Sequence, residues 1–206
     1  THCHLDAAEF DADRDAVYAA ATAAGVGRIV VPGVTVNRHF RPKSTIAEYP
    51  ACVEAYGIHP LYVDQSSLED LPRLRGWLQQ APPVAVDPVL KQLRRIGVRG
   101  GIAHAFNGSR QQADEFIKLG FVLGFGGAMT FDGSTRIREL AKTLPLESIV
   151  LETDAPDIPP AWLNRGRNSP AELPRIADTL AELRGLSRNE VVAATAANAR
   201  RILPGI

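Results

Sequence analysis

The chain alternates short apolar runs rich in Val, Ile and Phe with longer stretches whose apolar residues recur every three or four positions. The first pattern is typical of buried strands and the second of amphipathic helices, so the alternation predicts βαβ units and a parallel sheet. The expected strands, some together with the turn or loop that follows, lie within residues 28–33, 51–60, 83–86, 100–109, 121–127 and 148–156. The expected helices, with their caps, cover 11–24, 67–80, 109–119, 136–143, 169–185 and 187–203.

Several helix ends are marked by capping residues. Ser109 with Gln112, and Ser187 with Glu190, have the spacing of a capping box, in which each side chain satisfies the other's backbone N–H group. Gly185 stands where the helix before it should end. These signals predict where three of the helices begin or end.

Length and composition indicate one ordinary globular domain. With 206 residues and no linker, repeat or low-complexity tract, residues 1–206 are expected to form a single domain. Lys plus Arg number 23 and so do Asp plus Glu, so the formal net charge is zero. That balance argues against a broad basic surface for duplex nucleic acid or an anionic membrane, but it allows one localised phosphate site.

The expected location is the cytoplasm. The chain has two cysteines and shows neither a signal-like opening nor an apolar run that approaches the roughly 18 residues of a membrane-spanning helix. Reduced thiols are the rule for such proteins. No membrane partner is expected.

Potential metal ligands recur at the carboxyl ends of the expected strands. His2 and His4 open the chain, His59 and His104 follow two later strands, and Asp154 follows the apolar run 148–152. In parallel α/β folds, and above all in barrels, the carboxyl ends of the strands form the active-site rim. The placement therefore predicts one shared site.

The spacing of the first two histidines fits metal binding. Side chains two apart on a strand point to the same side, so His2 and His4 can bind one ion. Neutral imidazoles and a carboxylate form a common zinc-type site that leaves room for water. Taken alone, His104 is more often a core or loop histidine and Asp154 a turn or helix cap, so it is their joint placement that favours a metal.

Two loops are candidates for phosphate binding. The loop at Asn107 opens a capped helix, and a helix start of this kind can hold an anion, although an ordinary N-cap is the favoured interpretation. Arg165 and Arg167 follow the last strand and could grip a phosphate through paired hydrogen bonds. A solvated loop is the competing interpretation.

With these residues assembled, the chain resembles the TatD family of metal-dependent hydrolases, within the amidohydrolase-like barrels, over nearly its whole length. The segments "GFGGAMTF" and "DAPDIPP" are most similar to those of the YjjV-type branch. The segments that carry the resemblance are "THCHLD", "RIVVPG", "YGIHP", "IAHAFNGS", "LGFGGAMTF", "LPLESIVLETDAPDIPP" and the closing "NSPAEL", "LAELRG" and "ANARRI".

The resemblance implies a TIM-type (β/α)8 barrel that acts as a deoxyribonuclease on DNA ends or single-stranded DNA. It also implies divalent cofactor ions (Mg, Mn or Zn), two in each active site. A monomer is expected. By position, His2, His4, His104 and Asp154 match family metal ligands, and Asp154 would also accept a proton from the attacking water. Glu152 matches a supporting carboxylate.

His59 matches a histidine near the pocket, and Asn107, Arg165 and Arg167 are the candidate substrate-binding residues. None of these four matches a family metal ligand.

One family segment has no counterpart. After "VAV" the family continues with a glutamate that bridges two metals and a later histidine ligand, whereas here Val86 runs directly into Asp87. About fifty residues are lacking, the size of one βα unit of the barrel. Either the unit is truly deleted or the printed sequence omits it. We favour omission, because the junction carries no turn signal and a deletion would expose two strand edges.

The sequence is therefore compatible with three functions. The first is a TatD-like phosphodiesterase that uses metal-activated water. The second keeps the barrel and the metal but acts on a small amide, lactone or phosphate ester, which fold and ligands cannot separate from the first. The third is a catalytically impaired homologue, if the internal deletion is real.

Overall fold

The computed structural model describes residues 2–35, 46–55, 67 and 100–203. The strands in these ranges are β1 (Ile29–Pro32), β2 (Cys52–Ala55), β3 (Gly101–Ala103), β4 (Phe121–Phe125) and β5 (Ile149–Leu151). The α-helices are α1 (Arg14–Ala23), α4 (Arg110–Lys118), α5 (Thr135–Thr143), α6 (Leu173–Arg184) and α7 (Arg188–Ile202). Short 3-10 helices are η1 (Ala8–Phe10), η4 (Gly127–Thr130), η5 (Leu146–Ser148), η6 (Ala161–Leu163) and η7 (Pro170–Glu172).

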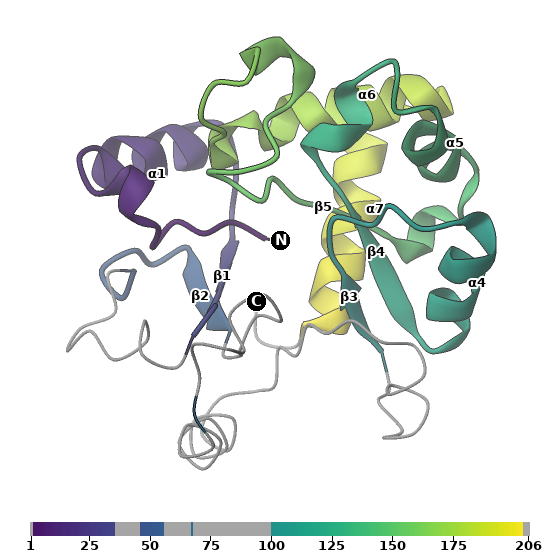
Figure 1. Ribbon diagram of the computed structural model, residues 1–206, viewed down its shortest axis with the longest axis horizontal. Helices are drawn as coiled ribbons and strands as arrows, with labels where there is room; N and C mark the ends of the chain where they lie inside the picture. The colour runs from purple at the N-terminus through teal and green to yellow at the C-terminus, as the bar shows by residue number, and fades with distance from the viewer. Residues whose placement is uncertain (1, 36–45, 56–66, 68–99, 204–206) are drawn as a thin grey trace.

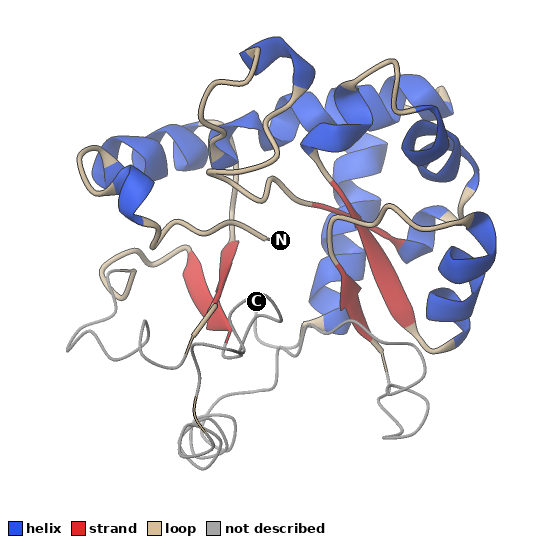
Figure 2. Cartoon of the chain, viewed as in Figure 1, coloured by secondary structure: helices blue, strands red, loops and turns tan. Residues whose placement is uncertain are grey.

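The strands form two parallel sheets. One pairs β1 with β2, and the other has the order β3-β4-β5 (Figure 1). The helices gather on the outer side of the strands, most densely around the three-stranded sheet (Figure 2). The expected α/β fold with parallel strands is confirmed.

The segment of residues 2–4 joins the two sheets. Cys3 forms a parallel bridge with Ala155, which follows β5, while the Cys3 N–H donates to the Val30 carbonyl of β1 at 3.1 Å. The His4 N–H donates to the Ala155 carbonyl at 2.7 Å. The N-terminal segment accordingly runs between the two groups of strands (Figure 1).

A shared inner layer of apolar side chains connects both sheets. Each strand contributes one residue to it. Because successive residues on a strand face opposite sides, the neighbours of these residues point to the other face. The inner-layer residues pack with the C-terminal part of α7. The members of this layer are Val30, Ala55, Ile102, Val122, Val150, Ala199 and Leu203.

The opposite face of the three-stranded sheet packs on helices α4 to α7. Leu123 and Phe125 of β4 and Ile149 of β5 lie in this second core, and each is almost fully buried. From the helices come Leu140 of α5 and Leu180 of α6. The apolar stripe that predicted the α6 helix is the face that packs against the sheet.

The predicted helix ends are largely confirmed. Both capping boxes form, at Ser109 before α4 and at Ser187 before α7, and Gly185 ends α6 in the left-handed conformation at φ 65°. The helix expected from residue 11 begins at Arg14, because residues 8–10 form the separate 3-10 helix η1 and Asp13 takes the N-cap position.

A closed ring of strands is not present in the described part of the chain, where the five strands stay in two sheets. The expected helix at 67–80 and strand at 83–86, like the junction between Val86 and Asp87, fall outside the described residues, apart from the single residue at 67. The same holds for residues 56–60 of the expected second strand. The structure therefore confirms the α/β fold, while the described residues show no closed barrel.

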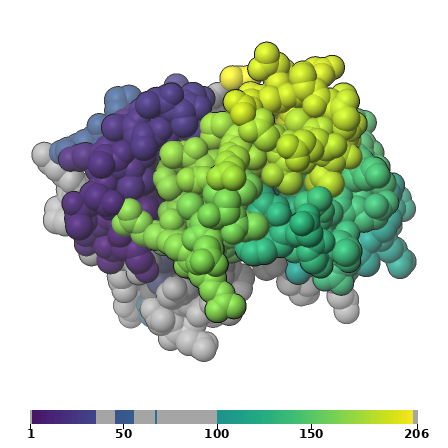
Figure 3. Space-filling model, turned by 90° about the horizontal axis from the view of Figure 1, so that it is seen from above, coloured from purple at the N-terminus to yellow at the C-terminus, as the bar shows by residue number. Residues whose placement is uncertain are grey.

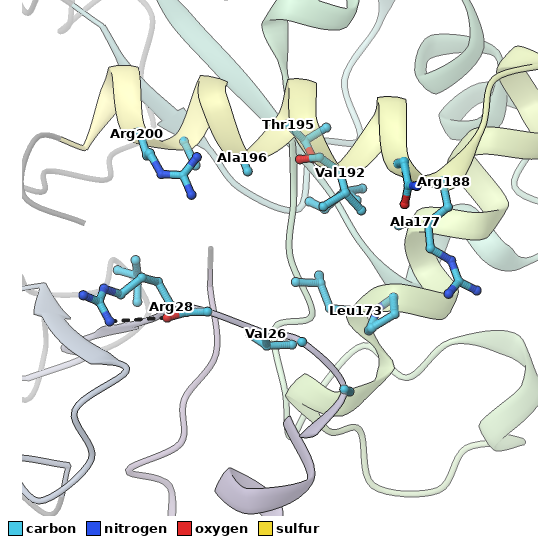
Figure 4. A pocket seen from close by; sticks show the side chains of 17 residues that line it. Val26, Arg28, Leu173, Ala177, Arg188, Val192, Thr195, Ala196 and Arg200 are labelled. Atoms are coloured by element: carbon cyan, nitrogen blue, oxygen red, sulfur yellow. Dashed lines mark hydrogen bonds between the residues drawn. The ribbon is translucent and has the colours of Figure 1, made fainter. Parts of the chain in front are cut away.

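A cavity of about 610 Å³ lies between the turn from α1 to β1 and the helices α6 and α7. Val26, Leu173, Ala177 and Val192 form much of its apolar wall (Figure 4). None of the candidate metal ligands lines it. Val30 of β1 and Leu151 of β5 also line it.

The described helices are too short to cross a membrane. The longest, α7, has 15 residues, whereas a spanning helix needs about 20. No helix in the described ranges meets the length and hydropathy of a membrane span.

The packing of α6 gives a stability prediction. Leu180→Ala should lower the free energy of unfolding by about 2–5 kcal/mol, because Leu180 is fully buried and the change leaves a cavity. Val192→Ala on α7, where the side chain is 43% exposed, should change it by no more than about 0.5 kcal/mol. Urea unfolding followed by circular dichroism measures both. Equal effects would show that the α6 face is not packed as described.

Candidate metal centre

His2 and His4 reach the same side of the chain because they flank Cys3 on the extended bridging segment. Cys3 points into the apolar core and is 2% exposed, so its two neighbours point the other way. Their Nε2 atoms lie 3.1 Å apart. The expected pairing of the two imidazoles is therefore present.

Three of the predicted ligands meet at this point. One ligand atom from each of His2, His104 and Asp154 lies within 4.8 Å of the others. The His2 and His104 rings stack with their centroids 4.1 Å apart. Asp154 Oδ1 is 3.0 Å from His2 Nε2 and 3.8 Å from His4 Nε2, so His4 lies beside the same carboxylate.

Asp154 follows β5 in a tight turn. Its backbone is left-handed at φ 56°, which is uncommon for a residue other than glycine. The Asp154 N–H donates to the His2 carbonyl at 2.9 Å, so the aspartate and the first histidine are tied through the main chain as well as through their side chains. This bond fixes where the carboxylate can reach.

His104 follows β3, and the next residue also has a left-handed backbone, Ala105 at φ 46°. The Ala105 N–H donates to Glu152 Oε1. Glu152 is 1% exposed, and its second carboxylate oxygen, Oε2, is buried and has no hydrogen-bond partner among the described residues. The carboxylate of Glu152 thus reaches from the end of β5, past β4, to hold the turn behind His104.

Gly124 on β4 leaves the space for this buried carboxylate. A Cβ atom at position 124 would collide with the Glu152 carboxylate oxygens. An isolated glycine inside an apolar strand often marks such a close approach, so "FVLGF" carried a signal for this contact. Gly124, Glu152 and Asp154 also line a cavity of about 130 Å³ beside the ligands, together with Asn107.

Burial controls the protonation of the cluster. Burial above all, and to a smaller extent the electrostatic effect of His104 and His4, lowers the pKa of His2 to about 4 against the opposing effect of Asp154, so His2 is neutral near pH 7. Burial alone would raise the pKa of Asp154, but the contacts with His2, His104 and His4 bring it below its usual value. Burial raises the pKa of Glu152 to about 7, although the Ala105 N–H opposes the shift.

These donors fit a divalent cation. Two imidazole nitrogens and a carboxylate oxygen lie 3.0–3.8 Å from one another, and their lone pairs repel unless a cation or a proton lies between them. Ligand atoms about 2.1 Å from one metal lie roughly 3 Å or more from each other, in keeping with these separations. The set offers nitrogen and oxygen ligands of the kind that Zn²⁺ and related ions take.

The remaining predicted residues lie elsewhere. Arg167 forms two hydrogen bonds with Asp13, at 2.9 and 2.5 Å, and its guanidinium stands 4.7 Å from the centre of the Phe10 ring. These contacts join the loop after β5 to the N-terminal part of the chain, and the two regions adjoin in Figure 3. Arg167 is thus engaged in the fold. Arg165 is exposed.

Asn107 lies at the rim, where its side-chain oxygen accepts a hydrogen bond from Arg136 at 2.7 Å. His59 lies outside the described residues. The sequence interpretation overlooked Asn168, a fully buried side chain below the Asp154 turn. Its signal in the sequence is weak, because a single asparagine in a polar loop has no distinguishing pattern.

A family model described as TatD related DNase matches the chain over residues 1–89 and 84–204. The chain belongs to the TatD family of metal-dependent hydrolases. The two matched stretches meet at residues 84–89, where the sequence analysis places the lacking βα unit. This agreement supports the position of that junction.

Relatives of the same family align over most of the chain. The metal-dependent hydrolase YjjV of Escherichia coli K12 is 29% identical over 240 residues, which cover 94% of this chain and 93% of YjjV. The 3'-5' ssDNA/RNA exonuclease TatD of Salmonella typhimurium is 27% identical, with 97% of this chain and 96% of that protein covered. The alignment with YjjV is longer than this chain, so YjjV has residues that lack a counterpart here.

Solved structures agree with this assignment. The crystal structure of the Escherichia coli TatD homologue YjjV superposes with a TM-score of 0.91 at 28% identity, over 98% of this chain and 96% of that one. A TatD-family hydrolase from Entamoeba histolytica gives a TM-score of 0.83 at 14% identity, over 100% of this chain and 97% of that one, and shows the shared fold alone. The described strands therefore take the arrangement of a TatD-family structure.

The contact between Gly124 and Glu152 gives a second prediction. Gly124→Ala should lower the free energy of unfolding by about 1–3 kcal/mol, because the new methyl group displaces a fully buried carboxylate. Gly133→Ala, where a Cβ meets nothing within 4 Å, should be neutral or slightly stabilising. Urea denaturation of the two variants tests the pair. A neutral Gly124→Ala would show that the Glu152 carboxylate does not lie against β4.

Proposed function

We propose that this TatD-family hydrolase cleaves phosphodiester bonds at DNA ends or in single-stranded DNA. The observation that carries the proposal is the convergence of His2, His4, His104 and Asp154 at one point of an α/β fold of this family. The printed function of the Salmonella relative, a 3'-5' exonuclease on single-stranded DNA and RNA, supports the substrate class.

In this proposal the four side chains hold a divalent ion. A bound ion of this kind polarises a phosphoryl oxygen and lowers the pKa of water to about 7. The histidine set is suited to ligation because burial keeps His2 neutral, so that its lone pair is available. Asp154 is ionised at neutral pH and lies at the centre of the cluster, where it can accept a proton from the attacking water.

We propose that the family segment between Val86 and Asp87 completes both the barrel and the set of metal ligands. With it, the two described sheets would close into an eight-stranded barrel, and two more ligands would allow a second ion. A second ion would let the site stabilise both the attacking and the leaving oxygen of an in-line displacement. Both the closed barrel and the second ion depend on this segment.

Substrate contacts are proposed at the rim. Asn107 borders the cavity beside Glu152 and Asp154, and the exposed Arg165 lies in the loop that follows β5. With zero formal net charge, the chain fits local capture of a strand end better than wrapping of a duplex. Arg167 is a weaker candidate than Arg165, because Asp13 already neutralises its guanidinium.

The ligand proposal predicts the effect of one isosteric change. Asp154→Asn should slow Mn²⁺-dependent cleavage of single-stranded DNA, and of a small phosphodiester, by at least about 100-fold, because the site loses a ligand charge and a proton acceptor. Rates are measured by release of labelled nucleotide and of chromogenic phenol. EDTA should abolish both activities in the unaltered protein.

The control carries the same chemical change on the surface of α4. Asp114→Asn removes a carboxylate that pairs with Arg110 and is 43% exposed, so activity should stay at the wild-type level. Equal rates for Asp154→Asn and the unaltered protein would contradict the proposed site. Cleavage of the small ester but not of DNA would leave the metal centre standing and reject the nucleic-acid substrate.

Mass spectrometry tests the internal segment directly. If the full-length protein contains a further βα unit between Val86 and Asp87, its intact mass should exceed the 22.2 kDa of the present sequence by several kilodaltons, since about fifty residues are at issue. Peptide mapping across the junction locates the added residues. A tryptic peptide that joins Val86 directly to Asp87 would show a true deletion.

A further inference from the structure

Asn168 lies directly beneath the turn that carries Asp154. Its side chain is fully buried, and its amide Nδ2 lies within hydrogen-bond distance of three backbone carbonyls of one loop. The two N–H bonds of Nδ2 serve the carbonyls of Thr153 at 2.7 Å, of Asp157 at 2.8 Å and of Ile158 at 3.1 Å, so that one N–H is shared between two carbonyls. Backbone carbonyls on both sides of Asp154 thus accept hydrogen bonds from the same amide group.

The loop needs such a support because its backbone is unusual. Asp154 has φ 56° and Ile158 has φ 45°, and a left-handed β-branched residue is rare unless its surroundings hold it there. The main chain of Asn168 adds a further tie, since its N–H donates to the Pro156 carbonyl at 3.0 Å. Asn168 Oδ1 in turn accepts from the Ser169 N–H at 2.8 Å, which fixes the amide orientation.

From this geometry we propose that Asn168 is a positioning residue for the metal centre. Its amide holds the 153–158 loop in the one conformation that aims the Asp154 carboxylate at His2 and His4. The inference rests on the proposed metal-binding function, and it assigns to Asn168 a role that acts only through Asp154. The side chain itself stays buried and touches neither the histidines nor a substrate.

A purely structural role would have the same appearance, and the chain offers a matched residue that separates the two. Asn198 on α7 is 5% exposed, and its Nδ2 donates to the carbonyls of Leu146 and Ile149, each at 2.8 Å. These carbonyls lie at the opposite end of β5 from Asp154. Asn198 thus matches Asn168 in residue type, in burial and in its side-chain hydrogen bonds to backbone carbonyls, but it does not lie at the metal centre.

The test compares Asn168→Asp with Asn198→Asp. Each change keeps the side-chain shape and replaces an amide donor by an oxygen that faces carbonyl oxygens, so both variants should unfold at lower urea concentration than the wild type. Mn²⁺ binding is then followed by the electron paramagnetic resonance of the free ion. Asn168→Asp should weaken Mn²⁺ binding by about 10–100-fold, the usual effect of removing a support behind a ligand. Asn198→Asp should bind Mn²⁺ as the wild type does.

Each outcome decides the matter. Wild-type Mn²⁺ affinity in Asn168→Asp, or an equal loss in both variants, would overturn the positioning role while the metal centre stands. Failure of the unaltered protein to bind Mn²⁺ would overturn the metal centre, and this inference with it. If Asn168→Asp does not fold, Asn168→Ala removes the amide without adding a charge, and it must show a loss of Mn²⁺ affinity that Asn198→Ala does not.

Discussion

The structure depends on the backbone pairing of residues 2–4. Through Cys3 this short segment bonds to β1 on one side and to the chain that follows β5 on the other. It is the link through which main-chain hydrogen bonds join the two described sheets side by side. The same three residues carry the first histidine pair, so the geometry of the site and the joining of the sheets are one arrangement. A shift in this pairing by one residue would turn both imidazoles into the apolar core.

Much of the fold could be predicted from local patterns, because strands, helices and caps are specified by residues close in sequence. The capping boxes at Ser109 and Ser187 and the stop at Gly185 are examples. The ligand cluster was predictable in composition, since its members stand at strand ends. The isolated Gly124 in an apolar strand signals a close approach but does not identify Glu152 as the partner. The role of Asn168 depends on a tertiary contact that no local pattern specifies.

The candidate ligands are supported by turns of unfavourable backbone conformation. Ala105 follows His104, and Asp154 is itself left-handed. Each conformation costs about 1–3 kcal/mol and persists only where surrounding bonds enforce it. Here one turn is held by the Glu152 carboxylate and the other by the Asn168 amide, both of them buried. The rigidity of the site therefore comes from polar groups beneath it, while the apolar core fixes the strands that deliver them.

The separation of the ligands along the chain has a thermodynamic consequence. His2 and Asp154 are 152 positions apart, and they meet only when the N-terminal segment lies in place between the two sheets. A cation bound by both residues would bind the native arrangement but not an opened one. By mass action, its concentration would therefore affect how firmly the N-terminal segment stays between the two sheets. At a hundred times its dissociation constant, such an ion adds about 2.7 kcal/mol to the folded state. Depletion of the ion would then favour local opening that begins at the amino-terminal residues, with hydrogen exchange at Cys3 and His4 as its first sign.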